Sequence, residues 1–198
     1  TNDILNSIME SLSHIDHIRA EEIPNINLYM DQVTTFMDEQ LASTKRYDDD
    51  KILTKTMINN YTKNHLLPPP VKKKYSKEHV LILIFIYYFK SILSIKDIET
   101  VLKPLTEKYF SGETSLDLSS IYEEICGIEK DRVEPLKETV KAAYEKSLSA
   151  FPDLPDGEDR DELKLFAFIC SLSFGVYLKK AMIEKLIDEL EDKKKEKN

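Results

Sequence analysis

Two uncharged apolar runs constrain the fold of this 198-residue chain more than any other feature. They occupy residues 80–89 and 165–178, and each is shorter than the roughly 17 to 25 residues that a helix needs to cross a bilayer. Ser76 precedes the first run at a distance suited to an N-cap. We therefore expect two helices buried in protein, inside their own domain or against another subunit, and no membrane anchor.

The rest of the sequence also favours helices. Ser94 and Ser120 are each followed by an acidic residue three positions later, which is the spacing of a capping box. Thr54 is the expected N-cap of a helix that must end before the prolines at 68–70. Strand patterns are almost absent, so we predict an all-α protein with at most a small hairpin around residues 71–75. Helices are expected at residues 4–15, 28–41, 54–64, 76–92, 94–110, from 120 onward, 133–148 and 162–190.

The chain lacks the patterns that mark most enzymes. Its four glycines stand alone, so no glycine-rich loop can hold a phosphate. His14 and His17 have no third ligand at metal-binding spacing, and no set of nucleophile, base and acid stands out. Cys126 and Cys170 occur without a recognisable secretory leader, which favours free thiols in the cytoplasm. We predict a protein that is not an enzyme and has no metal or cofactor.

Charge is distributed unevenly. The net charge is −8, but residues 51–90 carry eight lysines and only one acidic side chain, Glu78. Residues 1–50 carry three basic and eleven acidic side chains. A local basic surface is sufficient to bind a polyanion, whatever the total charge. The alternative is a solvated face dotted with lysines, so the uncharged residues around the lysines must decide between the two.

Residues 27–102 resemble the winged helix-turn-helix of the MerR family of bacterial transcription regulators. In that family a short recognition helix ends in a Leu-Leu-x-Pro turn, and a basic wing ending in tyrosine leads into the next helix. The chain is also similar, over most of its length, to a bacterial family known as domain of unknown function 1836, through residues 28–33 and 53–61. The segments that carry the two resemblances read LYMDQV at 28–33, LTKTMINNY at 53–61, LLPP at 66–69, KKKY at 72–75 and LSIKDI at 93–98.

The MerR resemblance implies a DNA-binding site on one helix and one wing. Asn59 or Asn60 would pair with adenine in the major groove, while lysines would hold phosphates. Two positions depart from the family: Asn59 stands where arginine is typical, and His65 stands where the turn usually has glycine. Tyr75 is expected either at the phosphate backbone or in the core with its hydroxyl at the rim. The expected DNA-binding residues are Lys55, Thr56, Asn59, Asn60, Lys63, Lys72, Lys73, Lys74 and Tyr75.

We expect three parts along the chain. They are an N-terminal helix in residues 1–26, a MerR-like DNA-binding domain in residues 27–110 and a helical dimerisation or regulatory domain in residues 111–198. By resemblance, the protein is a cytoplasmic regulator that binds double-stranded DNA as a homodimer and responds to an unidentified small-molecule effector. The alternative is a helical protein–protein interaction module of the same fold that does not read DNA sequence.

Overall fold

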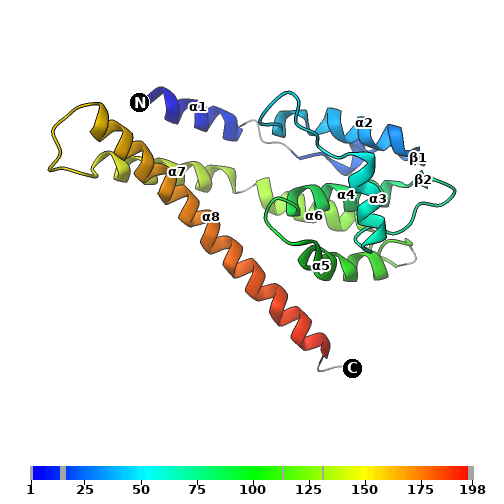
Figure 1. Cartoon of the computed structure of the whole chain (residues 1–198). Helices are drawn as coiled ribbons and strands as arrows, with labels where there is room; N and C mark the ends of the chain where they lie inside the picture. The colour runs from blue at the N-terminus through cyan, green and yellow to red at the C-terminus, as the bar shows by residue number, and fades with distance from the viewer. Residues whose placement is uncertain (1, 14–16, 113, 131, 196–198) are drawn as a thin grey trace. The chain divides into compact units, whose positions relative to one another are not determined.

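The computed structural model describes residues 2–13, 17–112, 114–130 and 132–195 (Figure 1). Helices hold 69% of the residues and strands 3%, so the predicted all-α class is confirmed. The elements are α1 Asn2–Ser13, η1 Ala20–Glu22, β1 Leu28–Tyr29, α2 Met30–Gln40, η2 Ala42–Thr44, α3 Lys55–Lys63, β2 Lys74–Tyr75, α4 Lys77–Phe89, α5 Ile95–Lys108, α6 Leu118–Lys130, α7 Val133–Leu148 and α8 Glu158–Lys195.

The elements form two compact units. The smaller unit contains α1, α7 and the part of α8 that ends at Ile183. The larger unit contains the elements from η1 to α6, as far as Gly127, together with the end of α8 from Glu184 onward. These units divide the chain at other places than the predicted boundaries at residues 26 and 110, because α1 packs with α7 and most of α6 belongs with the helices that precede it.

The larger unit is built around α4. Eight consecutive residues of this helix, from His79 to Ile86, are buried, so α4 is covered on every side. The expectation that residues 80–89 form a core helix is confirmed, and Ser76 is its N-cap. Phe85 meets Tyr122 of α6 edge to face, with ring centroids 5.5 Å apart. A helix that is apolar all round is stable in water only with such complete cover.

Helix α6 is tied to the start of the larger unit. The Tyr122 hydroxyl donates a hydrogen bond of 2.5 Å to the backbone carbonyl of Ile18. The predicted N-cap of α6 at Ser120 is wrong. The carboxylate of Asp117 accepts a 2.7 Å hydrogen bond from the Ser120 backbone N–H, which lowers the pKa of Asp117. A start three residues earlier lets Leu118 pack in the core, where it is only 1% exposed.

The small hairpin predicted around residues 71–75 is present, and a distant strand extends it into a two-stranded sheet. Val71 and Lys74 form a bridge that closes a tight turn. Strand β2 then pairs antiparallel with β1, which places Leu28 opposite Tyr75 and Tyr29 opposite Lys74. Leu28 and Tyr75 face the core, whereas Tyr29 is exposed. The turn was predicted from local residues, but its partner strand is distant in sequence.

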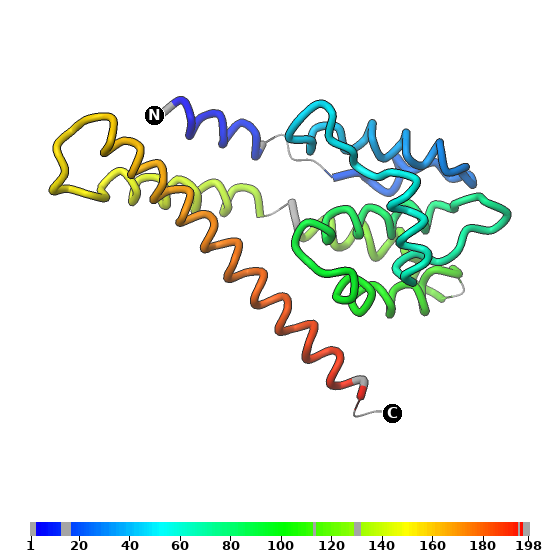
Figure 2. The backbone as a smooth tube through the Cα atoms, viewed as in Figure 1, coloured from blue at the N-terminus to red at the C-terminus, as the bar shows by residue number. Residues whose placement is uncertain are grey.

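The smaller unit has a core made by three helices. Val140 and Tyr144 of α7 pack on Phe168 of α8, and apolar side chains of α1 cover this cluster. Figure 2 follows α8 as one continuous helix from Glu158 to Lys195. Of the two positions expected for residues 165–178, inside their own domain or against another subunit, the first is not observed, because Phe168 is the only residue of this run that is buried.

Candidate nucleic-acid interface

Helix α3 presents five predicted DNA-contacting residues on its exposed side. The Thr54 hydroxyl accepts a 3.2 Å hydrogen bond from the Met57 backbone N–H, which confirms Thr54 as the N-cap. Ile58 and Tyr61 point into the core and hold the helix against the larger unit. The remaining side is polar and exposed, and we call it the α3 face. It consists of Lys55, Thr56, Asn59, Asn60 and Lys63.

Helix α3 ends in a Schellman motif at His65. The His65 N–H donates to the Thr62 carbonyl at 3.2 Å, and the Leu66 N–H donates to the Tyr61 carbonyl at 2.9 Å. His65 has φ 59°, the left-handed conformation that glycine adopts most easily. Leu66 and Tyr61 are both buried, so the motif also fixes where the chain leaves α3.

Replacement of His65 by glycine should stabilise the protein. Glycine removes the Cβ that makes the left-handed conformation costly, so we expect the free energy of unfolding to rise by about 1 kcal/mol. Urea unfolding of the wild type, H65G and H65A measures this change. His65→Ala removes the same exposed side chain but keeps the Cβ, and it should give no increase. Equal stability of H65G and H65A would contradict the strain argument.

The lysines at 72 and 73 form the tip of a tight turn, residues 71–74, which we call the lysine turn. Its backbone hydrogen bonds run from Lys74 N–H to the Val71 carbonyl at 3.0 Å and from Val71 N–H to the Lys74 carbonyl at 3.2 Å. Lys72 and Lys73 have φ angles of 51° and 64°. Two consecutive left-handed residues are typical of a type I′ turn, which favours Asn-Gly and disfavours lysine. The lysine turn therefore keeps two exposed charges at an energetic cost.

Contacts through the start of α2 connect the lysine turn to the α3 face. Lys55 of α3 forms an ion pair with Asp31 in the first turn of α2. Tyr29, the N-cap of α2, lies under Lys74, whose Nζ is 5.2 Å from the centre of the tyrosine ring. The backbone N–H of Tyr29 also donates to Gln32 Oε1 at 2.8 Å, which fixes this corner. Lys55 and Lys74 thus contact the same short segment, residues 29–31.

Tyr75 does not share this surface. It is 3% exposed and packs edge to face on His79, with ring centroids 5.4 Å apart. His79 in turn meets Phe110 at 4.7 Å. Of the two expectations for Tyr75, the core position is the one observed, and the side chain supports the lysine turn from below. The other eight predicted DNA-contacting residues are exposed or, for Lys74, half-buried.

His79 makes the support under the lysine turn sensitive to pH. Its Nδ1 accepts a 3.0 Å hydrogen bond from the Ser76 backbone N–H, and burial lowers the pKa of His79 below its ordinary value of 6.5. The unfolded chain therefore binds a proton at a pH where the folded chain does not. We expect the free energy of unfolding to fall as the pH drops from about 7 toward 5.

The variant H79Q removes the titrating side chain of residue 79 but can keep the hydrogen bond that caps α4. Glutamine can accept the same backbone N–H in a capping box but does not titrate, so H79Q should show a flatter pH dependence of stability. Urea unfolding of both proteins between pH 7 and pH 5 makes the comparison. The same slope in both would mean that His79 is not responsible.

A family match covers the elements that build this surface. The profile described as a domain of unknown function (DUF1836) matches residues 18–125, more than half of the chain. The chain belongs to the DUF1836 family. Searches of the curated proteins and of the solved structures find no significant match. The match confirms the resemblance to this family and takes in the α3 face and the lysine turn.

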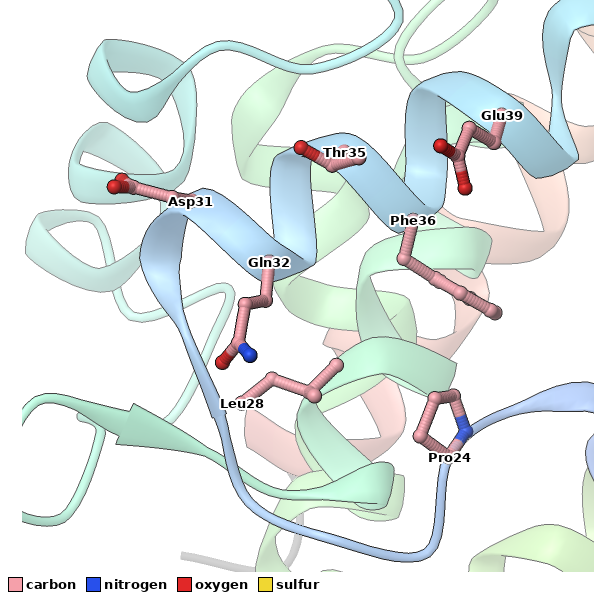
Figure 3. Close-up of a pocket in the computed structure, with 7 residues that line it drawn as sticks. All are labelled: Pro24, Leu28, Asp31, Gln32, Thr35, Phe36 and Glu39. Carbon is pink, nitrogen blue, oxygen red and sulfur yellow. The ribbon is translucent and has the colours of Figure 1, made fainter.

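The DUF1836 segment also has a shallow depression of about 350 Å³ along α2 (Figure 3). Leu28, Phe36 and Pro24 lie below the helix and form its apolar floor. The residues along the helix above them are polar or acidic, from Asp31 to Glu39. The depression is open to solvent and lacks the buried polar groups that orient a small ligand in an enclosed pocket.

The sequence predictions missed two residues of the DUF1836 segment, Tyr29 and Asp31. Both lie in the segment at 28–33 that carries the family resemblance, but their contacts are with residues far along the chain. Among the residues that the structure describes, no group of three or more His, Cys, Asp or Glu side chains is placed to hold a metal ion. His14 lies outside the described residues. Neither Cys126, which is buried, nor Cys170, which is half-buried, forms a disulfide.

Proposed function

We propose that the DUF1836 segment binds double-stranded DNA as a winged helix-turn-helix. Helix α3 would enter the major groove with Asn59 and Asn60 at the base edges. The wing is the small sheet with the lysine turn, and Lys72, Lys73 and Lys74 would contact phosphates. Lys55, Thr56 and Lys63 would hold the backbone on either side of α3. Tyr75 is left out because its side chain is buried.

The lysine turn is the observation that carries this proposal. Lys72 and Lys73 both have left-handed backbones at positions where Asn-Gly is favoured. Backbone strain of this kind persists where it serves a function, and a solubilising loop gains nothing from placing its charges at strained positions. The two lysines are also exposed at a tip, and they belong to a positively charged segment of a chain whose net charge is −8. Phosphate binding explains both the strain and the charge.

The MerR resemblance extends the proposal to a cytoplasmic transcription regulator. Such a regulator reads two half-sites as a homodimer, and residues 111–198 would provide the dimer contacts and a site for an unidentified effector. The proposal includes no enzymatic activity, no cofactor and no membrane partner. It requires that the protein prefer one DNA sequence over others.

Selection of bound fragments from random double-stranded DNA tests this requirement. We expect one enriched sequence, bound roughly 10³-fold more tightly than random duplex. The selection should be repeated with a K72N/K73G variant, which keeps the turn but loses two charges. Enrichment of no sequence by the wild type would contradict the regulator proposal.

A protein-interaction module remains the second candidate function. The depression along α2, with its apolar floor and its edge from Asp31 to Glu39, favours this alternative. The ion pair of Asp31 with Lys55 also cancels one positive charge beside the α3 face. In this alternative the lysines would meet an acidic protein surface, and DNA binding would show no sequence preference.

A further inference from the structure

Within the smaller unit, helix α8 has an exposed apolar face that α1 and α7 leave uncovered. Phe166, Phe174 and Tyr177 are 61%, 67% and 63% exposed. In contrast, Phe168 and Leu172 of the same helix pack on the cluster formed with α7 and α1. At about 100° per residue, the three exposed rings lie on the side of α8 that faces away from this cluster. Exposed aromatic surface of this extent marks an interaction site.

The exposed face has a regular pattern, which we call the α8 seam. Its members follow one another at spacings of three, four, four and three residues, which keeps them on one stripe of the helix. This order of spacings is the same when it is read from either end, and its midpoint is Cys170. The α8 seam consists of Leu163, Phe166, Cys170, Phe174 and Tyr177.

We propose that the α8 seam binds the α8 seam of a second copy of this chain, antiparallel, with Cys170 at the twofold axis. The symmetric spacing then places Phe166 of one copy opposite Phe174 of the other, and Leu163 opposite Tyr177. Both ends of the contact are identical, as a twofold interface requires. The small Cys170 side chain at the centre lets the two helices approach closely. The α8 seam would be the interface of the homodimer on which the proposed function rests. The dimer can be tested without DNA.

Charges at the two ends of the α8 seam favour the antiparallel orientation. Glu162 precedes the seam and Lys180 follows it, about five helical turns apart, so both lie on the same edge of α8. An antiparallel twofold pair brings this edge of one helix against the same edge of the other. Glu162 then meets Lys180 of the second copy, twice per dimer. A parallel pair would instead bring together the starts of both helices, where Asp159, Asp161 and Glu162 outnumber Arg160.

The exposed area is close to that of a small specific dimer interface. Three aromatic rings of about 200 Å² each, nearly two-thirds exposed, offer roughly 400 Å² per copy. Leu178 flanks the seam, about 80° from Cys170 around the helix, and is 58% exposed. With Leu163 these side chains approach the roughly 600 Å² per partner at the lower limit of a specific interface.

A membrane is the competing occupant, because α8 is long and apolar enough to cross one by length and composition. Its uncharged run of fourteen residues spans only about 21 Å, less than the roughly 30 Å of a hydrocarbon core. One side of the run is also occupied by α7 through Phe168 and Leu172. These features favour a protein partner.

Sedimentation of the full chain at micromolar concentration tests the proposal. We expect the wild type to be a dimer, with roughly twice the 23.0 kDa chain mass. The variant F166E/F174E should raise the dissociation constant by at least about 100-fold, since it replaces two aromatic contacts at the centre of the interface. The matched control is M182E, which changes an exposed apolar residue of α8 outside the seam and should remain a dimer. A monomeric wild type, or an F166E/F174E protein that still dimerises, would overturn the proposal.

Disulfide cross-linking tests the orientation. In a C170A background, L163C and Y177C should form an intermolecular disulfide only when the two variants are mixed and oxidised. A disulfide in either variant alone would show parallel pairing and overturn the proposal. Flotation with phosphatidylcholine–phosphatidylglycerol vesicles tests the competing occupant, and co-flotation of a monomeric wild type would assign the face to a membrane. A dimer that binds no DNA supports this inference and contradicts the proposed function, so the two can fail separately.

Discussion

Substitution of Lys72 by Asn and Lys73 by Gly is expected to weaken DNA binding by roughly 50-fold at 0.1 M salt and to make the protein more stable. Each lysine that contacts a phosphate contributes about 0.9 to the slope of log affinity against log salt, so the slope should flatten by about 1.8. Asn-Gly fits the type I′ geometry of the lysine turn without strain. The free energy of unfolding should therefore rise by about 1 to 2 kcal/mol.

If the K72N/K73G protein binds DNA more weakly but is more stable than the wild type, the loss of binding comes from the lost charges and not from a damaged fold. DNA affinity at several salt concentrations and urea unfolding measure the two quantities. The variant K141Q/K146Q removes the same charge from exposed positions on α7, outside the DUF1836 segment, and should leave the salt slope unchanged. Replacement of the same two lysines by alanine is a poorer test because alanine retains the left-handed strain. A stabilised K72N/K73G protein with the wild-type slope would remove the lysine turn from the interface and favour the protein-interaction alternative.

Local signals predicted the helices of the larger unit well. Thr54, Ser76 and Ser94 cap helices at the predicted positions, because a side-chain cap acts within three residues of itself. The prediction of Ser120 as the N-cap of α6 failed because caps act over such short distances. Asp117 lies three residues before Ser120 and offers a stronger acceptor, and the start that it sets also buries Leu118. Two nearby caps compete, and the packing of the first apolar residue decides between them.

Contacts between residues far apart in the chain could not be predicted from the sequence. Nothing in the residues around Tyr29 indicates that it lies under Lys74, or that Asp31 pairs with Lys55. These contacts depend on how β1 and α2 pack on the rest of the unit. The composition of residues 165–178 likewise indicates that the run needs cover, but only the packing of Phe168 on α7 shows which side is already covered. The uncovered side then gives the α8 seam.

Alanine substitution of Asn59 and Asn60 should reduce sequence preference more than overall DNA binding. An asparagine that pairs with adenine contributes about 1 to 3 kcal/mol of discrimination, so N59A or N60A should bind the selected site roughly 5- to 150-fold more weakly. Binding to random duplex should change much less, because phosphate contacts dominate it. Both side chains are exposed on α3, and alanine favours helix, so the fold should be retained.

Lys63 provides the matched control on the same helix. It is exposed at the last turn of α3 and is proposed to contact a phosphate, so K63A should weaken binding to the selected site and to random DNA by the same factor. It should also reduce the salt slope by about 0.9, whereas N59A and N60A should leave the slope unchanged. Affinities of the three variants for both DNAs at several salt concentrations give all these quantities. If the two asparagine variants behave as K63A does, with equal losses on both DNAs, then α3 holds the backbone and does not read bases. Any sequence preference would then have to come from another part of the DUF1836 segment. The wing would be the next candidate, because it could recognise a sequence through the deformability of the groove beside it.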